Sequence, residues 1–269
     1  MKRLRELLRV DPGARPRLRD ADAGQSFGWH EDAARAQTLE LKARLNALQH
    51  RLIVDGRFGL LIVLQAIDGG GKDSTVHHVI SAFNPQGCTV SAFKAPSVEE
   101  LRHDYLWRVH ARVPARGEIG VFNRSHYEEV LIARVDALVE RPVWRARYEQ
   151  INAFEAMLQA AGITVLKFFL HISRAEQRRR FEERLQDRAK NWKLEPDDLR
   201  KRGQWQAYRH AFQDMLARCS TRAAPWYAVP ADHRWLRNLA VAQIIADTLE
   251  ALPLRLPPPR FDPKRLRIR

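Results

Sequence analysis

Hydrophobic and polar positions follow one another along this chain in blocks that predict strands and helices in turn. Short apolar runs bounded by turn residues predict buried strands at 60–67, 88–93, 118–123 and 163–172, and WYAV at 226–229 predicts a fifth. Apolar residues at helical spacing predict helices at 31–54, 72–82, 98–112, 126–161, 174–191, 197–218 and 233–252. Strands that alternate with helices favour a parallel sheet covered on both faces, so the predicted fold class is α/β.

The pattern divides the chain into three parts. Residues 31–252 carry the alternating elements and are expected to form a single domain. Residues 1–30 are basic and punctuated by Pro and Gly, and are expected to form an extended N-terminal arm. Residues 253–269 form a basic, Pro-rich tail that is also expected to be extended.

The most informative segment is LLIVLQAIDGGGKDST at 60–75. A buried strand, three glycines (69–71), Lys72 and a helix start together predict a phosphate-binding loop, since glycines let backbone N–H groups face an anion. The match to the P-loop (Walker A) pattern is imperfect, because Ala66 replaces its first glycine and Asp73 its Ser or Thr. The magnesium contact of that hydroxyl then falls to Asp73, Ser74 or Asp68. The alternative is a glycine-rich turn with a solvated lysine.

Further polar residues are expected at the carboxyl ends of the neighbouring strands, where α/β proteins bind ligands. Lys94 follows the second strand, and Asn123 and Arg124 follow the third. Arg124 can hold phosphates bidentately. Asn123 stands where P-loop proteins usually offer a metal-binding acid, so it would be a neutral ligand, with Glu128 supplying charge instead. The alternative for Arg124 is an ion pair with Glu128.

Residues 174–202 are predicted to form a mobile lid. They carry eleven Lys and Arg against seven acids, and Arg180, Arg184 and Arg188 share one helix face. A lid that closes on phosphate and expels water is one reading; an exposed helix stabilised by ion pairs is the other.

Composition adds the expectation of a polyanionic partner. The chain carries 46 Lys and Arg against 32 Asp and Glu, a formal net charge of +14, and such a field attracts nucleic acid, an acidic surface or an inorganic polymer. No apolar run approaches the roughly 20 residues that span a bilayer, and the basic N-terminus lacks a secretory apolar core. We therefore expect a cytoplasmic protein without membrane contact, in which Cys88 and Cys219 are reduced.

Six segments then suggest a family. QAIDGGGKDST, NPQGC (84–88), FKAPS (93–97), FNRSHYEEVL (122–131), RLQDRAKNWK (184–193) and APWYAVPADHRWLRN (224–238) resemble, in order, the family-2 polyphosphate kinases. The resemblance spans about residues 30–250. It implies a P-loop kinase domain of thymidylate-kinase type, a three-layer α/β/α fold with a helical lid at about 174–202. It also implies phosphoryl transfer between inorganic polyphosphate and nucleotides with Mg²⁺, or Mn²⁺ in its place.

The resemblance also assigns roles. It implies that Asp68, Lys72 and Arg124 are catalytic and that Asp68 and Asn123 bind the metal. Phosphate and polyphosphate contacts are expected from Gly69, Gly70, Gly71, Lys72, Asp73, Ser74, Arg178, Arg184, Lys190 and Lys193. Nucleotide contacts are expected from Lys94, Asn123, Arg124, Tyr127 and Glu128. Asn123 followed by HYE resembles the subgroup that phosphorylates both nucleoside mono- and diphosphates, AMP to ADP and ADP to ATP, and a homo-oligomer (dimer or tetramer) is expected.

Rival functions differ in what they require. An ATP-dependent nucleoside monophosphate kinase of the same fold predicts a less basic surface. A P-loop nucleic-acid-binding protein predicts aromatic platforms among the basic residues, whereas Trp192, Trp205, Trp226 and Trp235 fall mostly at positions that look like core. A structural protein with an inactive loop is disfavoured by Asp68, Lys72 and Arg124. The sequence does not indicate which residues recognise the base, so adenine and guanine nucleotides both remain candidate substrates.

Overall fold

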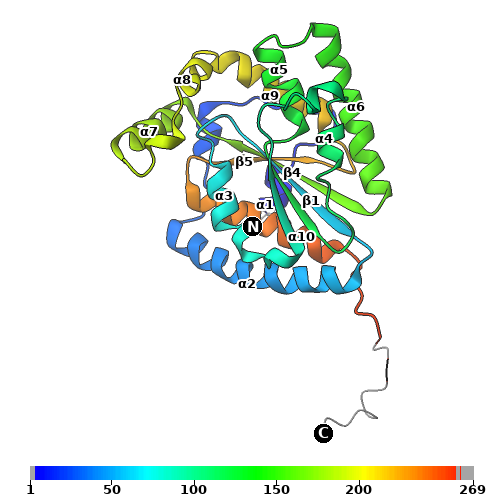
Figure 1. The fold of residues 1–269 in the computed structure, drawn as a ribbon. Helices are drawn as coiled ribbons and strands as arrows, with labels where there is room; N and C mark the ends of the chain where they lie inside the picture. Colours follow the sequence, from blue (N-terminus) through cyan, green and yellow to red (C-terminus); the bar gives the residue numbers. More distant parts are fainter. Residues whose placement is uncertain (1–3, 259–260, 262–269) are drawn as a thin grey trace.

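The computed structural model describes residues 4–258 and 261, and a five-stranded parallel sheet lies at its centre (Figure 1). The strand order is β2-β3-β1-β4-β5. The strands are β1 (Gly59–Gln65), β2 (Cys88–Ala92), β3 (Ile119–Asn123), β4 (Ile163–His171) and β5 (Trp226–Pro230). All five predicted strands are confirmed, because apolar runs between turn residues leave little choice of local structure.

The middle strand, β1, places the glycine loop at the centre of the sheet edge. All its residues are buried, and it pairs in parallel with β3 on one side and β4 on the other. The register sets Leu64 beside Asn123 and Gln65 beside Phe169. The segments after β1, β2 and β3 therefore emerge side by side, as the sequence predicts.

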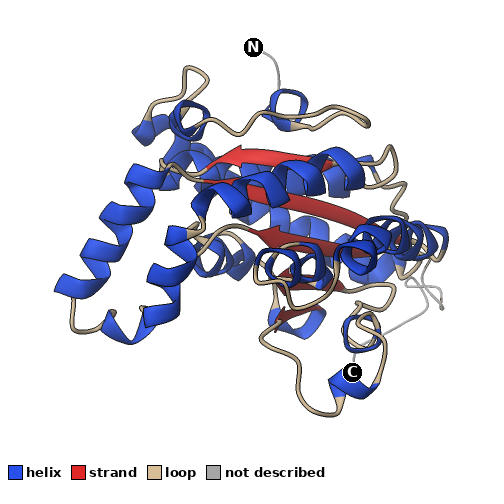
Figure 2. Ribbon diagram, turned by 90° about the horizontal axis from the view of Figure 1, so that it is seen from above, coloured by secondary structure: helices blue, strands red, loops and turns tan. Residues whose placement is uncertain are grey.

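Helices cover both faces of the sheet and complete three layers (Figure 2). One face carries α1 (Leu4–Leu8), α2 (Glu31–Asp55), α3 (Lys72–His78) and α10 (Arg234–Ala251). The other carries α4 (Trp107–His110), α5 (Ile132–Val135), α6 (Arg141–Ala160) and α9 (Trp205–Cys219). The predicted α/β/α architecture is confirmed.

One predicted helix is wrong. Residues 98–112 contain a 3₁₀ turn, η4 (Glu100–Arg102), and the single-turn α4, joined by turns. The Asp104 carboxylate accepts the Leu106 N–H at 2.9 Å. The Arg108 guanidinium donates hydrogen bonds to the Lys94 carbonyl at 2.9 Å and to the Glu100 carboxylate at 3.2 Å. These side-chain hydrogen bonds compete with a continuous helix.

Three other predicted helices are interrupted. The region 126–161 divides into η5 (His126–Val130), α5 and α6, with Ala137 in a left-handed conformation (φ 51°) and Pro142 in the first turn of α6. The region 197–218 divides at Gly203 into α8 (Pro196–Gly203) and α9. The predicted helix 72–82 is α3 followed by η2 (Ile80–Ala82).

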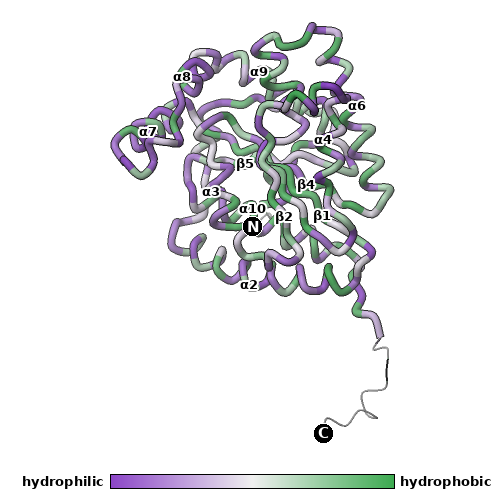
Figure 3. Tube along the Cα trace, in the orientation of Figure 1, coloured by the Kyte–Doolittle hydropathy of each residue, from purple (hydrophilic) through white to green (hydrophobic). Residues whose placement is uncertain are grey.

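The predicted lid is a helical hairpin of α7 (Arg174–Gln186), η6 (Asn191–Lys193) and α8, which projects from the body beside α3 (Figure 1). It is mostly hydrophilic, in contrast to the strands (Figure 3). Helix α7 ends five residues earlier than predicted. The Asn191 amide donates to the carbonyls of Arg184 and Leu185, and the Asp187 carboxylate accepts the Ala189 N–H.

The N-terminal segment is not wholly extended and it packs on the body. It contains α1 and a 3₁₀ turn, η1 (Asp20–Gly24), and Leu4, Leu8 and Leu18 are buried. Val10 N–H donates to the Trp226 carbonyl of β5 at 2.8 Å. Of the C-terminal tail, 253–258 have no helix or strand, and most of the remainder lies outside the described residues. No helix in the part of the chain that the structure describes is long and apolar enough to cross a membrane.

Candidate active site

In the loop after β1, most backbone carbonyls accept hydrogen bonds, whereas several N–H groups have no acceptor among the described residues. Gly69 (φ 81°) and Gly71 (φ 98°) adopt left-handed conformations that favour glycine. The carbonyls of Ala66, Ile67 and Gly71 accept hydrogen bonds from the loop itself or from α3, and those of Asp68 and Gly69 accept from Gln177 and Arg180 of α7. Within the described residues, the N–H groups of Gly71, Lys72 and Asp73 have no acceptor. A loop with this pattern offers donors to an anion.

Lys72 lies at the head of α3 with its side chain folded back over the loop. It is buried, and Nζ donates to the Ala66 carbonyl at 2.9 Å. Burial lowers the pKa of Lys72, and Arg124 lowers it further, while Asp68 and Glu128 oppose the shift. Within the described residues its ammonium has one hydrogen-bond partner of the three it can take, so two donors are left for phosphate oxygens.

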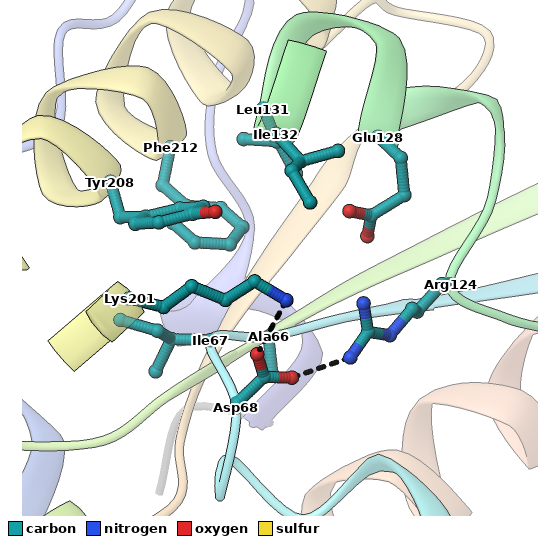
Figure 4. Close-up of a pocket in the computed structure, with 10 residues that line it drawn as sticks. All are labelled: Ala66, Ile67, Asp68, Arg124, Glu128, Leu131, Ile132, Lys201, Tyr208 and Phe212. Atoms are coloured by element: carbon teal, nitrogen blue, oxygen red, sulfur yellow. Dashed lines mark hydrogen bonds and ion pairs between the residues drawn. The ribbon is translucent and has the colours of Figure 1, made fainter. Parts of the chain in front are cut away.

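Asp68 lies between two cations at the mouth of a pocket (Figure 4). Its Oδ1 accepts from Arg124 Nη2 at 2.6 Å, and its Oδ2 lies 3.5 Å from Lys201 Nζ. Burial alone would raise the pKa of Asp68, but the charges of Lys72, Arg124 and Lys201 outweigh it and lower the pKa. The carboxylate is therefore ionised and held in place. The open alternative for Arg124, an ion pair with Glu128, is wrong, since the partner is Asp68.

Arg124 occupies a strained backbone conformation. Its φ is 63°, in the left-handed region that non-glycine residues rarely adopt. Its N–H donates to the Leu64 carbonyl of β1 at 3.1 Å, which pins the turn to the central strand. Strain of this kind persists at sites where side-chain direction matters, and here it aims the guanidinium at Asp68.

The pocket beyond Asp68 has a charged floor and an apolar wall. Lys201, Asp68 and Arg124 line one side, and Leu131, Ile132, Tyr208 and Phe212 lie across from them, with Glu128 beside Ile132 (Figure 4). Burial raises the pKa of Glu128, although Arg124 and Lys72 oppose the shift. A pocket with converging charges beside an apolar wall suits a ligand that has phosphates at one end and a ring at the other.

Asn123 and Asp73 form a pair at the loop. Asn123 Nδ2 donates to Asp73 Oδ1 at 2.6 Å, whereas the other predicted metal ligand, Asp68, is held by Arg124 and Lys201. These oxygen donors fit a hard cation such as Mg²⁺, which proteins hold through one or two carboxylates together with substrate phosphates. Among the described residues, no three His, Cys, Asp or Glu side chains form a metal-binding group.

The lid cations that are predicted to contact phosphate make contacts with neighbouring residues of the lid. Arg178 is exposed and pairs with Glu182 at 2.7 Å, and Lys190 pairs with Asp187 at 2.6 Å. Arg184 donates to the Lys193 carbonyl, and Lys193 lies over the Trp192 ring. Trp192 is 75% exposed, so its assignment to the core is wrong. Lys94, at the end of β2, is also exposed.

Tyr127 needs a correction. The sequence predicts a nucleotide contact for it, but its side chain is fully buried in the core between the sheet and helices α6 and α9. Its hydroxyl donates to Glu155 at 2.8 Å and accepts from Lys167 at 2.8 Å. Lys167 also donates to Glu155 at 2.5 Å. Tyr127 therefore anchors η5, the turn that follows Arg124, rather than a ligand.

Four further residues contact the loop that the sequence did not single out as site residues. Lys201 reaches Asp68, Gln177 donates to the Asp68 carbonyl, Arg180 donates to the Gly69 carbonyl, and Arg237 donates to Ser74 Oγ. One signal was readable. Arg237 is in line with Val241 and Ile245 on the buried face of a helix, a position that rarely carries charge.

A parallel sheet with this loop after its central strand, and a helical hairpin beside the loop, defines a P-loop kinase fold. The chain belongs to the polyphosphate kinase 2 (PPK2) family, whose model matches residues 28–255. It is 46% identical over 253 residues to the AMP/ADP-polyphosphate phosphotransferase of Meiothermus ruber, covering 93% of this chain and 95% of that protein. It is also 46% identical to the ADP-polyphosphate phosphotransferase of Rhodopseudomonas palustris, over 80% of this chain and 78% of that protein.

A solved structure agrees with these relatives. The crystal structure of polyphosphate kinase 2 from Arthrobacter aurescens TC1 superposes with a TM-score of 0.93 at 40% identity. The match covers 97% of this chain and 94% of that one. The resemblance that the sequence segments suggest is thereby confirmed, along with the fold that it implies.

Proposed function

We propose that this protein transfers phosphoryl groups directly between inorganic polyphosphate and nucleotides. The observation that carries the proposal is the Asp68 carboxylate, which belongs to the glycine loop and is held between Arg124 and Lys201 in the pocket. The names of the relatives above support the same chemistry.

In this proposal the loop and Lys72 hold the end of the polyphosphate donor, and the pocket holds the acceptor. Arg124 and Lys201 bind the acceptor phosphate. Asp68 orients the attacking oxygen of that phosphate and holds the two cations in position. The apolar wall of Tyr208, Phe212 and Leu131 takes the base. The transferring group passes in line from one phosphate to the other through a loose transition state, so positioning and charge neutralisation supply most of the catalysis. The reaction needs no phosphorylated side chain.

The metal that we propose is Mg²⁺, with Mn²⁺ as a substitute. Asp68 or Asp73 together with Asn123 would hold it beside the loop, because their oxygen atoms suit a hard cation. Once bound, such an ion neutralises phosphate oxygens as charge develops on them.

The acceptors that we propose are both AMP and ADP, in line with the name of the Meiothermus ruber relative. The pocket wall offers few hydrogen-bonding groups to a base, so adenine and guanine nucleotides should both be accepted. A cytoplasmic location is in line with two free cysteines, and we also propose a homo-oligomer.

A transfer assay tests the proposal. Purified protein, magnesium and long-chain polyphosphate are mixed with AMP or ADP in the absence of added ATP, and the nucleotides are separated by chromatography. Formation of ADP and ATP that is lost in Lys72→Ala is the expected result. Transfer to AMP from ATP but not from polyphosphate would instead support the rival nucleoside monophosphate kinase.

A further inference from the structure

Arg237 is a fully buried guanidinium that pairs with no acidic side chain in the described part of the chain. It lies on α10 behind the phosphate-binding loop and is 0% exposed. Its hydrogen-bond acceptors within the described residues are Ser74 Oγ at 3.0 Å and the side-chain oxygen of Asn238 at 2.8 Å, both of which are neutral. Buried charges are ordinarily paired, because removal from water penalises them.

The two arginines nearest to Arg237 are compensated. Arg180 pairs with Glu176 at 2.7 Å and donates to three carbonyls, and Arg234 pairs with Glu183 at 2.7 Å. Burial, followed by repulsion from Arg180 and Arg234, lowers the pKa of Arg237 to about 9. Arg237 therefore still carries its charge near neutral pH. In the free protein, no acidic side chain among the described residues offsets the free-energy cost of burying that charge.

The loop lies directly against this charge. A side chain at Gly71 would overlap Nη1 of Arg237, and it would lie 3.5 Å from Nη1 of Arg180. Two guanidinium groups thus meet the rear of Gly71, while the N–H groups of Gly71, Lys72 and Asp73 have no acceptor among the described residues. The unpaired cation therefore lies against the backbone of the same loop whose N–H donors have no acceptor among the described residues.

We propose that Arg237 is a buried counter-charge for the phosphate chain of the donor. It is unpaired in the free protein and becomes balanced when a chain of phosphates occupies the loop, acting across the backbone without touching the anion. Coulomb interactions act strongly over such short distances when water is excluded. Arg237 is in this sense a positioning residue, and the inference rests on the proposed function because it assumes that the loop holds polyphosphate.

A purely structural role makes the opposite prediction. If Arg237 only clamps Ser74 and Asn238, its loss should destabilise the free protein and leave anion affinity unchanged. If it is a counter-charge, replacement by a neutral side chain of similar size should leave the free protein equally or more stable, since unpaired buried charge is unfavourable, and should weaken anion binding.

The test compares Arg237→Met, Arg237→Lys and a matched control, Arg44→Met. Arg44 is an exposed arginine that pairs with Glu250 near the other end of α10, about 20 Å from Arg237 along the helix. Inorganic tripolyphosphate is titrated calorimetrically into each protein without nucleotide or metal, and thermal unfolding is recorded without the anion. We expect the Met variant to keep or raise its Tm and to bind tripolyphosphate at least about tenfold more weakly. The Lys variant should keep most of the affinity, and the control should match the wild type.

Unchanged tripolyphosphate affinity in Arg237→Met overturns the inference, whatever its Tm. If the Met variant loses both tripolyphosphate affinity and thermal stability, the Lys variant decides between the two roles. An Arg237→Lys protein that binds tripolyphosphate like the wild type but has a low Tm supports the counter-charge. An Arg237→Lys protein that has the wild-type Tm but binds weakly overturns it. The transfer assay reports separately. Tripolyphosphate binding that needs Arg237, without transfer to a nucleotide, would keep this inference and overturn the proposed function.

Discussion

At the scale of single residues, the site depends on backbone positions as much as on charged side chains. Gly71 has to be glycine for two independent reasons, its φ of 98° and the guanidinium of Arg237 packed against it. Arg124 carries a strained φ of 63° so that its side chain meets Asp68. Both features are invisible in a pattern of residue types, because φ and packing depend on the tertiary structure.

We expect Gly71→Ala to abolish transfer, with activity reduced by at least about a hundredfold, because the loop must move to release the overlap with Arg237. The same change should lower the free energy of unfolding by about 1–2 kcal/mol. Gly203→Ala is the matched control, since a side chain at Gly203 would meet nothing within 4 Å. Initial rates and urea unfolding of both variants test this. Normal rates in Gly71→Ala would show that the loop tolerates displacement.

At the scale of elements, hydrophobic periodicity predicted the strands and the loop because those segments are fixed by local sequence. It failed at 98–112, where Asp104 and Arg108 bind backbone groups instead of allowing a helix. The candidate site shows the same division. Asp68 and Lys72 were readable from one contiguous motif and Arg124 from a second, whereas Lys201 and Arg237 reach the loop from helices more than a hundred residues away. Such contacts depend on the arrangement of the helices, which the sequence pattern leaves open.

The lid is tied to the pocket by Lys201 of α8. Its Nζ lies 2.9 Å from Asp197 and 3.5 Å from Asp68. We expect Lys201→Met to raise the KM for the acceptor nucleotide about tenfold while the affinity for tripolyphosphate stays close to that of the wild type, because Lys201 meets the loop only at Asp68, within the pocket lining of the described residues. Steady-state kinetics and calorimetry separate the two ligands. Arg200→Met, which removes the neighbouring exposed cation, is the control. An equal loss for both ligands would contradict this division.

The buried Glu155–Lys167 pair joins α6 to β4 and supports η5 through Tyr127. Burial alone would raise the pKa of Glu155, but Lys167 and His126 lower it below its usual value. A depressed folded pKa means that this carboxylate contributes stability above its unfolded pKa of about 4.5, and that the contribution is lost as the pH falls through the folded value.

Glu155→Gln should therefore cost about 3–5 kcal/mol at pH 7, because Lys167 is left buried and unpaired. The double variant with Lys167→Met should recover most of that stability and should lose less than the wild type as the pH falls below about 4.5. Urea unfolding between pH 3 and 7 measures both effects. A double variant as unstable as the single one would mean that the pair is needed for packing rather than for charge balance.

At the scale of the whole molecule, the net charge of +14 distinguishes the two substrates. A long polyanion can interact with many surface cations at once, whereas in the proposed function the acceptor nucleotide binds in the pocket alone. The lid contributes eleven of the 46 Lys and Arg residues, and several of them, such as Arg178 and Lys190, are engaged only in exposed ion pairs that contribute little to stability. Their excess over the acids is more useful as a field that attracts polyphosphate than as a stabilising network.

Salt should therefore weaken the binding of the polyphosphate donor much more than the binding of the acceptor nucleotide. Between 50 and 200 mM NaCl we expect the KM for long-chain polyphosphate to rise roughly tenfold, since each phosphate contact releases or competes with counterions. The KM for ADP, measured at saturating polyphosphate, should change less than about threefold, because the pocket charges are partly buried and poorly screened. Tripolyphosphate is too short to extend far beyond the loop, so the salt dependence of its binding should be intermediate between those of long-chain polyphosphate and ADP. A polyphosphate KM that is insensitive to salt would confine binding to the loop and leave the basic surface without a part in it.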